Sequence, residues 1–339
     1  MNHEPQEAFV SVKDIAKWYP YKGKKKSSHG KKEKDWIKAV DGITIDIQHG
    51  EILGVIGESG CGKSTLGKIL TRLEDPTQGD CYIDGVSTRE MIKKDQKQFR
   101  SQVQIVFQNP FDTFTPRDTI AKILMRPLKN YKIGADDDAR YQLCIDALES
   151  GGFRPAEDIM KRYPHELSGG QLQRISIIRS MFLNPGFIIA DEPVSMLDVS
   201  VRAEIINMLI RLSREKSAAV MFISHDIALT RYISDNIAVM YLGRIVEYGP
   251  ANEVVRSPRH PYTKALISNC ASIDPEEKSE SISIEGEPPT PLNPGPGCYF
   301  APRCYMACEE CYKKYPDKVM LDSSHWAACS RIATAAKTE

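Results

Sequence analysis

Short apolar runs separated by amphipathic segments predict an α/β fold for most of this chain. Runs that are typical of buried strands lie at 51–57, 103–107, 187–190 and 218–223. Segments with helical spacing fall between them, as in a parallel sheet that is covered by helices on both faces. We therefore expect a largely parallel α/β sheet at the core of the protein.

Two further pairs of segments predict β structure beside this core. Alternating residues at Phe9–Val12 and Ile43–Ile47 indicate paired strands. The segments Asn236–Tyr241 and Ile245–Gly249 flank the tripeptide Leu242-Gly243-Arg244 and predict a β-hairpin. We expect this hairpin to close the core.

The stretch from Asp112 to Glu166 has a different pattern. It contains the helix-like segments Thr119–Leu128 and Asp138–Glu149 and no strand pattern. We therefore interpret about 109–168 as a helical subdomain that is inserted into the sheet domain.

The amino-acid composition of the sequence changes again after Pro250. Prolines become frequent, and a run that begins at Pro288 predicts a linker leading to a group of cysteines. The predicted organisation is therefore one domain over 1–255 and a C-terminal extension over 256–339.

Composition and charge exclude several classes of protein. The 339 residues are 41% hydrophobic, with 45 Lys+Arg against 45 Asp+Glu, so a disordered chain is excluded and binding to nucleic acid is not expected. The apolar runs fall short of the roughly 20 residues of a membrane span, and the N-terminus has no secretory pattern, so we expect a cytoplasmic protein. The lysine-rich segment 21–34 predicts a solvated loop, with contact to an anionic lipid or phosphate as the alternative.

A glycine-rich loop between the first core strand and a helix predicts a phosphate site. Glycines let backbone N–H groups turn inward around phosphate oxygens, and the following helix directs its positive end at the same point. Lys63 supplies a positive charge, and the Ser64 hydroxyl is a ligand for Mg²⁺. The loop consists of Gly57, Glu58, Ser59, Gly60, Cys61, Gly62, Lys63, Ser64 and Thr65.

Two carboxylates at the end of the strand 187–190 predict a second part of this site. Burial makes charge costly at a strand end unless a cation or a reaction requires it. Asp191 suits Mg²⁺, directly or through water, and Glu192 is the candidate for polarising an attacking water.

A capped helix start lies in the segment 167–174, which ends 17 residues before the first of these carboxylates, Asp191. Ser168 suits an N-cap, and Gly169, Gly170 and Gln171 follow it. A helix start of this kind is a second anion site, although such a cap is more often purely structural.

At this point the chain resembles the nucleotide-binding subunit of an ATP-binding cassette (ABC) transporter, whose motifs occur here in the family's order. The resemblance identifies 168–171 as the signature, Asp198 as the D-loop residue, Gln108 as the Q-loop residue and His225 as the switch histidine. It also suggests Tyr19 as the aromatic residue that stacks on adenine, although Trp18 is adjacent.

The resemblance implies a P-loop NTPase fold with a helical subdomain and a mechanism that one chain does not complete. Two ATPase subunits face head to tail, so that ATP held by Lys63 of one is covered by Ser168 and Gly170 of the other. Gln108 then senses Mg²⁺ and nucleotide, and His225 contacts the γ-phosphate. The implied chain is a peripheral subunit on the cytoplasmic face of a membrane, held there by permease subunits.

Five cysteines between 298 and 329 predict a metal site. Four thiolates suit tetrahedral Zn²⁺ or an iron–sulfur cluster, and spacing does not decide between them. Reduced cysteines in a proline-rich tail are the alternative. The cysteines are Cys298, Cys304, Cys308, Cys311 and Cys329.

This tail resembles that of the ATPase subunits of dipeptide and oligopeptide permeases, in His260-Pro-Tyr-Thr, Gly286-Glu-Pro-Pro and 297–311. The resemblance implies a [4Fe-4S] cluster on Cys298, Cys304, Cys311 and Cys329, with Cys308 as an extra thiol.

The same resemblance implies ATP-driven peptide uptake. The implied partners are a related second ATPase, two permease subunits and an extracytoplasmic solute-binding protein. Import of nickel or oligosaccharides, a soluble ABC ATPase that acts on ribosomes or DNA, and a metal-sensing regulator are the alternatives.

Overall fold

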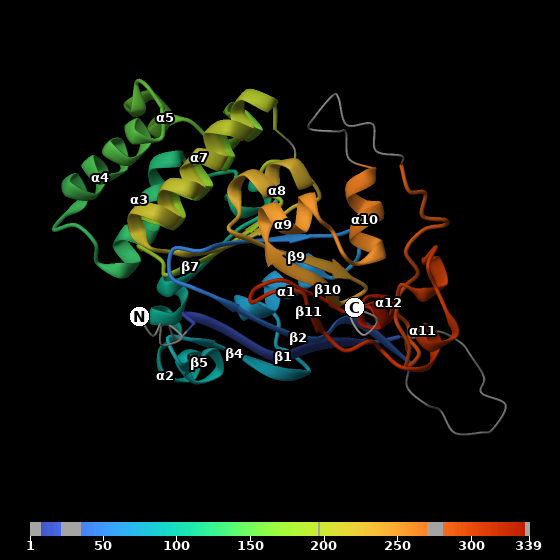
Figure 1. Ribbon diagram of the computed structural model, residues 1–339. Coiled ribbons are helices and arrows are strands. Elements are labelled where there is room, and N and C mark those ends of the chain that lie inside the picture. Colours follow the sequence, from blue (N-terminus) through green and yellow to red (C-terminus); the bar gives the residue numbers. More distant parts are fainter. Residues whose placement is uncertain (1–7, 22–34, 196, 270–280, 336–339) are drawn as a thin grey trace, which may run out of the picture. The chain divides into compact units, whose positions relative to one another are not determined.

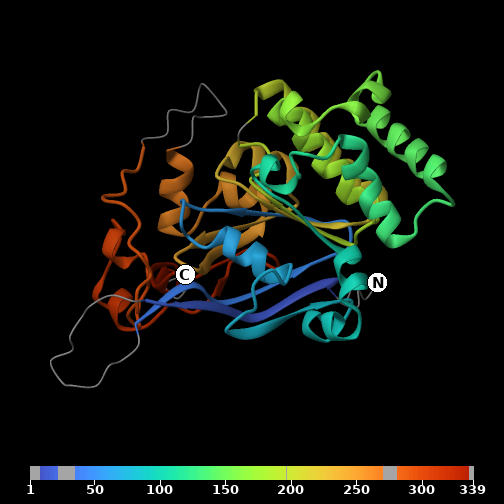
Figure 2. The same cartoon turned by 180° about the vertical axis from the view of Figure 1, so that it is seen from behind.

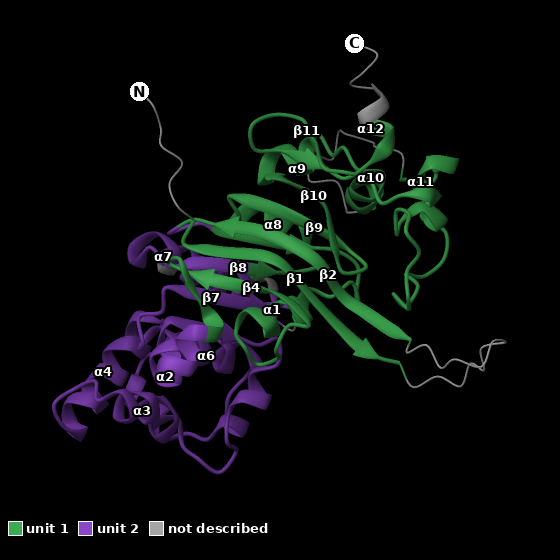
Figure 3. Ribbon diagram, turned by 90° about the horizontal axis from the view of Figure 1, so that it is seen from below, with its two compact units in different colours: residues 1–48, 52–89, 222–339 green, residues 49–51, 90–221 purple. Residues whose placement is uncertain are grey.

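The computed structural model describes residues 8–21, 35–195, 197–269 and 281–335 (Figure 1). The chain forms two compact units, the first from residues 1–48, 52–89 and 222–339 and the second from 49–51 and 90–221 (Figure 3). Residues 22–34 of the lysine-rich segment lie outside the described part, so the expected solvated loop or lipid contact stays a prediction.

One sheet of the first unit is antiparallel, with the strand order β2-β1-β4-β5. Its strands are β1 (Val10–Pro20), β2 (Trp36–Ile47), β4 (Gln78–Ile83) and β5 (Val86–Ser87). Val10 pairs with Ile47 of β2 and with Ile83 of β4, and all three side chains are buried. The predicted pairing of the segments 9–12 and 43–47 is therefore confirmed.

The first unit also holds strands in the order β11-β12-β10-β9-β3. They are β3 (Ile52–Ile56), β9 (Asn236–Tyr241), β10 (Arg244–Pro250), β11 (Val319–Met320) and β12 (Trp326–Ala327). β3 runs parallel to β9, whereas β9 with β10 and β10 with β12 are antiparallel. The predicted hairpin is thus confirmed, and the C-terminal extension adds strands to its outer side.

Helices of the first unit follow strands or turns. α1 starts directly after the glycine-rich loop, and α8 packs on β3, where Thr230 and Ser234 lie so close to Gly54 that a Cβ there would be 2.3 Å from the Thr230 methyl carbon. The helices are α1 (Lys63–Leu70), α8 (Ile227–Ile233), α9 (Ala251–Arg256), α10 (Pro261–Ser268), η3 (Ala301–Arg303), α11 (Glu309–Lys313) and α12 (Ser330–Ala335).

The C-terminal extension shares its core with the strands of the first unit. Tyr262 of α10 and Phe300 are fully buried against Tyr241 of β9. The ring centroids are 4.7 Å apart for Tyr241 and Tyr262, 5.2 Å for Tyr241 and Phe300, and 5.3 Å for Tyr262 and Phe300. Such aromatic clusters contribute beyond the area that they bury.

Hydrogen bonds also join the extension to strand β2. In both views the red C-terminal segment lies beside the blue ribbon of β1 and β2 (Figures 1 and 2), where Lys38 N–H donates to the carbonyl of Pro291 at 2.9 Å. Asp41 accepts from the Tyr299 hydroxyl at 2.7 Å and from both Nε and Nη2 of Arg244, at 3.0 and 2.8 Å.

A buried carboxylate forms another junction. Glu247 of β10 has no exposed side-chain area and accepts three hydrogen bonds of 2.8 Å each, from the N–H groups of Arg259 and His260 and from Nε2 of His325. A buried carboxylate is tolerated when its oxygens are paired in this way.

The second unit contains parallel strands β6 (Val103–Val106) and β7 (Phe187–Asp191), whose pairing begins with Val103 opposite Phe187. The chain returns to the first unit within β8 (Ala219–Ile223), all of whose residues are buried. These strands confirm that the predicted apolar runs are buried strands.

The helices of the second unit are α2 (Thr88–Gln102), α3 (Ile120–Tyr131), α4 (Asp137–Ser150), α5 (Ala156–Lys161), α6 (Gly169–Met181) and α7 (Val199–Lys216), with short 3₁₀ turns at η1 (Pro110–Thr113) and η2 (Pro164–Glu166).

Polar caps fix the starts of the helices in the stretch 112–166. Thr119 accepts a hydrogen bond from Lys122 N–H at the start of α3, and Asp136 accepts one from Ala139 N–H at 2.8 Å at the start of α4. Within the described ranges, no helix combines the length and the apolar character that crossing a membrane requires.

Candidate functional site

The glycine-rich loop lies where the sequence predicts it, between the end of β3 at Ile56 and the start of α1 at Lys63. Gly57, Gly60 and Gly62 have φ angles of 154°, 77° and 104°, which glycine adopts without strain. A Cβ on Gly62 would lie 2.0 Å from the carbonyl oxygen of Ala39, so no other residue fits there without a shift of the backbone.

Lys63 folds its side chain back over this loop. Its Nζ donates to the carbonyl of Gly57 at 2.7 Å and to that of Glu58 at 3.0 Å, and the residue is only 6% exposed. The ammonium group is thereby held inside the curve of the loop, beside the start of α1. Ser59 and Ser64 are exposed and Thr65 is half-buried on the same segment.

These residues fit a bound nucleotide phosphate. The N-cap of α1 is Gly62, which has no side chain to cover the positive end of the helix. The Cys61 side chain of the loop is buried, and burial raises the pKa of its thiol, so that a neutral group faces Lys63. The one cation enclosed by the loop is therefore available to balance an anion.

The aromatic candidates on β1 have separate partners. The Tyr19 hydroxyl bonds to the Glu74 carboxylate, and burial together with this hydrogen bond raises the pKa of Tyr19 to about 12. Trp18 donates from Nε1 to Asp41 at 3.2 Å, and Lys38 Nζ lies 4.9 Å from the centroid of its ring. Of these two residues, Tyr19 is the one whose pKa is also influenced by Thr65 of the glycine-rich loop, which lowers it slightly.

His225 follows β8 in the first unit and is exposed. Its neighbour Ser224 donates from N–H to the carbonyl of Val55 at 3.2 Å, and Asp226 caps α8 by accepting from Leu229 N–H at 3.0 Å. These bonds fix the turn that carries His225 next to the end of β3, from which the glycine-rich loop departs.

In the second unit the two predicted carboxylates end strand β7. Asp191 is 9% exposed, and Glu192 follows it with a φ of 47°. A left-handed backbone is unusual for a residue with a side chain, and strained positions of this kind recur at active sites. Gln108 Nε2 donates to Glu192 Oε2 at 3.0 Å and to Ser195 Oγ at 3.2 Å, so the predicted Q-loop residue and the catalytic candidate are in direct contact.

Helix α6 begins with a reciprocal cap. Ser168 Oγ accepts from Gln171 N–H at 3.2 Å, and Gln171 Oε1 accepts from Ser168 N–H at 2.9 Å. A Cβ on Gly170 would lie 2.7 Å from a methyl group of Val201 on α7. A Cβ on Gly169 would approach only Leu197 from outside its own helix, at 4.0 Å. The structural role of this motif is thus confirmed, and Gly169 leaves the helix start open. Asp198 is the exposed N-cap residue of α7.

Two contacts of the predicted site residues were missed from the sequence. The first is Ser195, which lies between Gln108 and the Glu192 backbone carbonyl, to which its Oγ donates at 3.1 Å. The second is Arg303, which pairs with Glu58 of the glycine-rich loop from 245 residues away. Only the short spacing from Glu192 to Ser195 offered a signal in the sequence.

The predicted iron–sulfur or zinc site is wrong. Among the residues that the structure describes, no group of three or more His, Cys, Asp and Glu side chains is arranged to hold a metal ion. Four cysteines do line one cavity, namely Cys298, Cys304, Cys311 and Cys329, but its volume is about 10 Å³. That is space for one water molecule at most and not for a cluster.

The cysteines of this region are free thiols in this structure. Burial raises the pKa of Cys298 to about 11 and also raises the pKa of Cys304 and Cys311, so these thiols stay neutral. Cys308, the predicted extra thiol, instead has its Sγ 3.5 Å from that of Cys311. The alternative of reduced cysteines is the one that fits.

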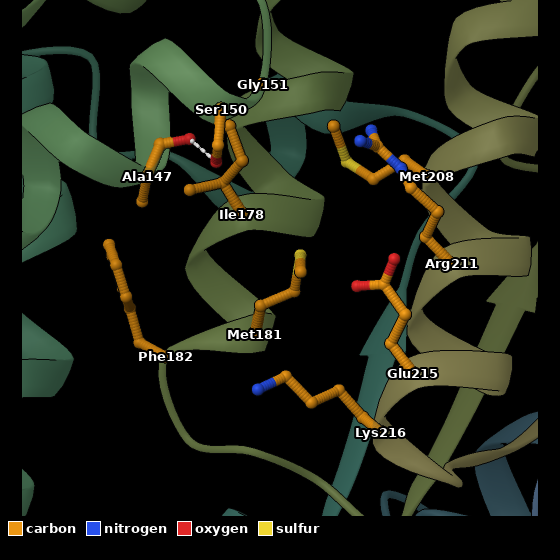
Figure 4. Close-up of a pocket in the computed structure, with 10 residues that line it drawn as sticks. All are labelled: Ala147, Ser150, Gly151, Ile178, Met181, Phe182, Met208, Arg211, Glu215 and Lys216. Carbon is orange, nitrogen blue, oxygen red and sulfur yellow. Dashed lines mark hydrogen bonds between the residues drawn. The ribbon is translucent and has the colours of Figure 1, made fainter.

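A cavity of about 310 Å³ in the second unit lies apart from these motifs (Figure 4). Apolar side chains of α6, including Ile178 and Met181, face Met208 and the charged residues Arg211 and Glu215 of α7 across it. No residue of the predicted ATPase motifs lines it, so it is not the nucleotide site.

Comparison with known families agrees with the motifs. Residues 40–195 match the ABC transporter family, and residues 246–311 match the C-terminal region of oligopeptide/dipeptide transporters. The second match contains Arg303 and all of α10.

Curated relatives match nearly the whole chain. The dipeptide transport ATP-binding protein DppF of Haemophilus influenzae is 41% identical over 319 residues, which cover 94% of this chain and 95% of the relative. DppF of Escherichia coli is 41% identical over 314 residues, 92% of this chain and 91% of the relative.

Solved structures show the same fold. The ATP-binding cassette MJ0796, in a dimeric post-hydrolysis state bound to ADP and Pi, matches with a TM-score of 0.61 and 28% identity over 71% of this chain and 98% of that chain. The cassette CbiO1 of Clostridium perfringens matches with a TM-score of 0.59 and 24% identity over 74% of this chain and 92% of that chain. The chain therefore belongs to the ATP-hydrolysing ATP-binding proteins of ABC transporters, in the group that carries the oligopeptide/dipeptide transporter C-terminal region.

Proposed function

We propose that this chain is the ATP-binding and ATP-hydrolysing subunit of an importer for dipeptides or oligopeptides. The observation that carries the proposal is the joint match of the cassette and of the C-terminal region to proteins that transport dipeptides, over more than nine tenths of the chain. The partners that this function requires are membrane permease subunits and a solute-binding protein. The chain then acts at the cytoplasmic face of the membrane, held by the permeases.

The glycine-rich loop is the part that binds the phosphates of ATP. Lys63 leaves the carbonyls of Gly57 and Glu58, or shares its three protons with them, to contact phosphate oxygens. Ser64, Gln108 and Asp191 are the residues that would hold Mg²⁺, which neutralises charge on the phosphates when it is bound. Tyr19, beside Thr65, is the candidate for stacking on adenine.

Glu192 is the residue that orients and polarises the attacking water. Its carboxylate already accepts from Gln108, and the strained backbone at φ 47° fixes its direction. His225 is the candidate contact of the γ-phosphate. Gln108 therefore links the catalytic carboxylate to the residues 109–113, which begin the predicted helical subdomain.

The signature residues Ser168, Gly169, Gly170 and Gln171 act on ATP bound by a partner ATPase, with Asp198 in the same interface. The related cassette MJ0796 is dimeric, which supports this arrangement. The partner ATPase is a related but different chain in our proposal.

Glu192→Gln tests the chemistry in the complex reconstituted with permeases and binding protein. The amide keeps the size of the side chain but is a far weaker base, so turnover should fall at least about 100-fold while ATP binding persists. Glu157→Gln, an exposed glutamate on α5, is the matched control and should leave turnover unchanged. Substantial hydrolysis by Glu192→Gln would overturn its assigned role.

Lys63→Ala tests the phosphate site and should weaken ATP binding by about tenfold or more, because a charged contact is lost. Lys68→Ala, five residues further along α1 and exposed, is its control. Peptide specificity is tested by adding dipeptide, nickel or an oligosaccharide to the reconstituted complex. Stimulation of ATP hydrolysis by dipeptide supports the proposal, and stimulation by either of the others alone refutes it.

A further inference from the structure

An arginine of the C-terminal extension forms an ion pair with the glycine-rich loop. Arg303 Nη1 donates to Glu58 Oε2 at 2.8 Å, and Nη2 donates to Glu58 Oε1 at 3.0 Å. The pair is well shielded, since the Arg303 side chain is 8% exposed and that of Glu58 is 25% exposed. Two parallel bonds between a guanidinium and a carboxylate fix direction as well as distance.

The remaining donors of Arg303 anchor it to the rest of the first unit. Nη2 also donates to the carbonyl of Gly286 at 2.8 Å, Nε to that of Glu285 at 3.3 Å, and Nη1 to the Tyr241 hydroxyl at 3.3 Å. Arg303 therefore connects the linker, strand β9 and the glycine-rich loop through one rigid group. It is held at three points before it reaches Glu58.

The backbone of Glu58 has a second contact with the extension. Its N–H donates to the hydroxyl of Tyr262 at 2.9 Å, and Tyr262 is fully buried in the aromatic cluster with Tyr241 and Phe300. Phe300 lies three residues before Arg303, so packing in this cluster also positions the arginine.

The same residue, Glu58, connects these contacts to the ammonium group that binds phosphate. The Glu58 carbonyl accepts from Lys63 Nζ at 3.0 Å, whereas its N–H and its carboxylate are both bound by the extension. Because all of these bonds belong to one residue, a displacement of Glu58 would disturb them together. The shape of the loop around Lys63 thus depends on residues that lie more than 200 positions later in the chain.

We propose that Arg303, together with Tyr262, is a positioning residue for ATP binding that acts through Glu58. The inference rests on the proposed function of the glycine-rich loop as the ATP phosphate site. Arg303 does not touch the nucleotide in this proposal. It holds Glu58 so that the loop keeps the curvature in which Lys63 and the start of α1 meet the phosphates, which lowers the cost of ordering the loop on binding.

Binding of MgATP to the full chain tests this role, measured by titration calorimetry in the Glu192→Gln background, in which ATP is not consumed. Arg303→Ala should raise the Kd for MgATP about tenfold, equal to about 1.4 kcal/mol. Lys313→Ala is the matched control, because Lys313 is a cation of the same extension whose bond to Glu310, at 3.1 Å, is exposed. Its Kd should stay within about twofold of the parent.

A double-mutant cycle separates positioning from a structural role. Arg303→Ala should cost almost nothing further in a chain that already carries Glu58→Ala, because the partner through which it acts is gone. An equal increase in Kd in both backgrounds would overturn the proposal. Arg303→Lys, which keeps the charge but not the paired bonds, should bind with a Kd between those of the parent and Arg303→Ala.

If Arg303→Ala fails to fold, Tyr262→Phe tests the same role, because phenylalanine keeps the packing of the tyrosine ring. It removes only the hydroxyl that accepts from Glu58 N–H and should raise the Kd severalfold, whereas an unchanged Kd would count against the inference. Lys63→Ala distinguishes a failure of this inference from a failure of the proposed ATP site. If Lys63→Ala weakens binding and Arg303→Ala does not, the inference fails alone; if Lys63→Ala has no effect, the proposed function of the loop fails with it.

Discussion

Removing the buried carboxylate of Glu247 should loosen the C-terminal extension from the rest of the first unit. Glu247→Ala leaves without an acceptor the three donors that it now satisfies, from Arg259, His260 and His325. The bonds from His260 N–H and His325 Nε2 are fully buried. Water therefore does not readily replace the lost acceptor.

The size of the effect follows from these two donors. An unsatisfied buried donor costs about 1–3 kcal/mol, so two of them cost about 4 kcal/mol, in line with the roughly 3–5 kcal/mol for breaking a buried ion pair. For a chain of this size, each kcal/mol corresponds to about 2–4 °C. We therefore expect the melting temperature of the first unit to fall by about 10 °C.

Thermal unfolding of the full chain, followed by circular dichroism, measures this shift, and limited proteolysis reports release of the extension. Glu253→Ala is the matched control, because Glu253 is an exposed glutamate on α9 a few residues away. It should change the melting temperature by no more than about 2 °C. A Glu247→Ala chain that melts within the same range and resists protease like the parent would refute the reasoning.

The remaining predictions concern pH and the glycine-rich loop. Burial lowers the pKa of His260 from 6.5 to about 4, so between these values the unfolded state binds the proton and the folded state does not. The free energy of unfolding of the first unit should therefore drop as pH falls through this window, by roughly 3 kcal/mol at pH 4, as urea titrations at pH 7.5, 5.5 and 4 would show. His260→Asn, whose side-chain oxygen can still accept from Tyr262 N–H, should lose this dependence, and an unchanged pH profile would contradict the assignment. Gly62→Ala should abolish MgATP binding in calorimetry, because its Cβ would lie 2.0 Å from a backbone oxygen at a φ of 104°. Gly85→Ala is the control: Gly85 has a φ of 71° with open space around it, so this variant should bind MgATP like the parent. Normal binding by Gly62→Ala would show that the loop rearranges freely.

Local features of the fold and of the site could be predicted from the sequence. The cap of α6 follows from Ser168 and Gln171 three residues apart, and the glycine-rich loop follows from residue types that only one backbone shape requires. Strand β7 and its terminal carboxylates were visible because a buried strand has a continuous apolar pattern.

Contacts between distant segments could not be predicted. Glu58 and Arg303 are 245 residues apart, and β12 is only two residues long, too short to give a pattern. The cysteine prediction failed for a related reason: spacing along the chain says nothing about the size of the cavity between thiols or about their burial. The residue types indicated a metal site, but the packed thiols leave too little space for a metal cluster.

The pairing of β12 with β10 has a consequence for how the chain behaves in a crowded solution. Tyr248 of β10 pairs with Trp326, their rings stacked with centroids 6.2 Å apart, and Ala328 N–H donates to the Val246 carbonyl at 2.8 Å. An open sheet edge offers N–H and C=O groups to any passing strand and so invites aggregation. By pairing with Glu247 and Tyr248, the C-terminal extension covers part of the edge of β10 and so reduces strand exchange with neighbouring molecules there.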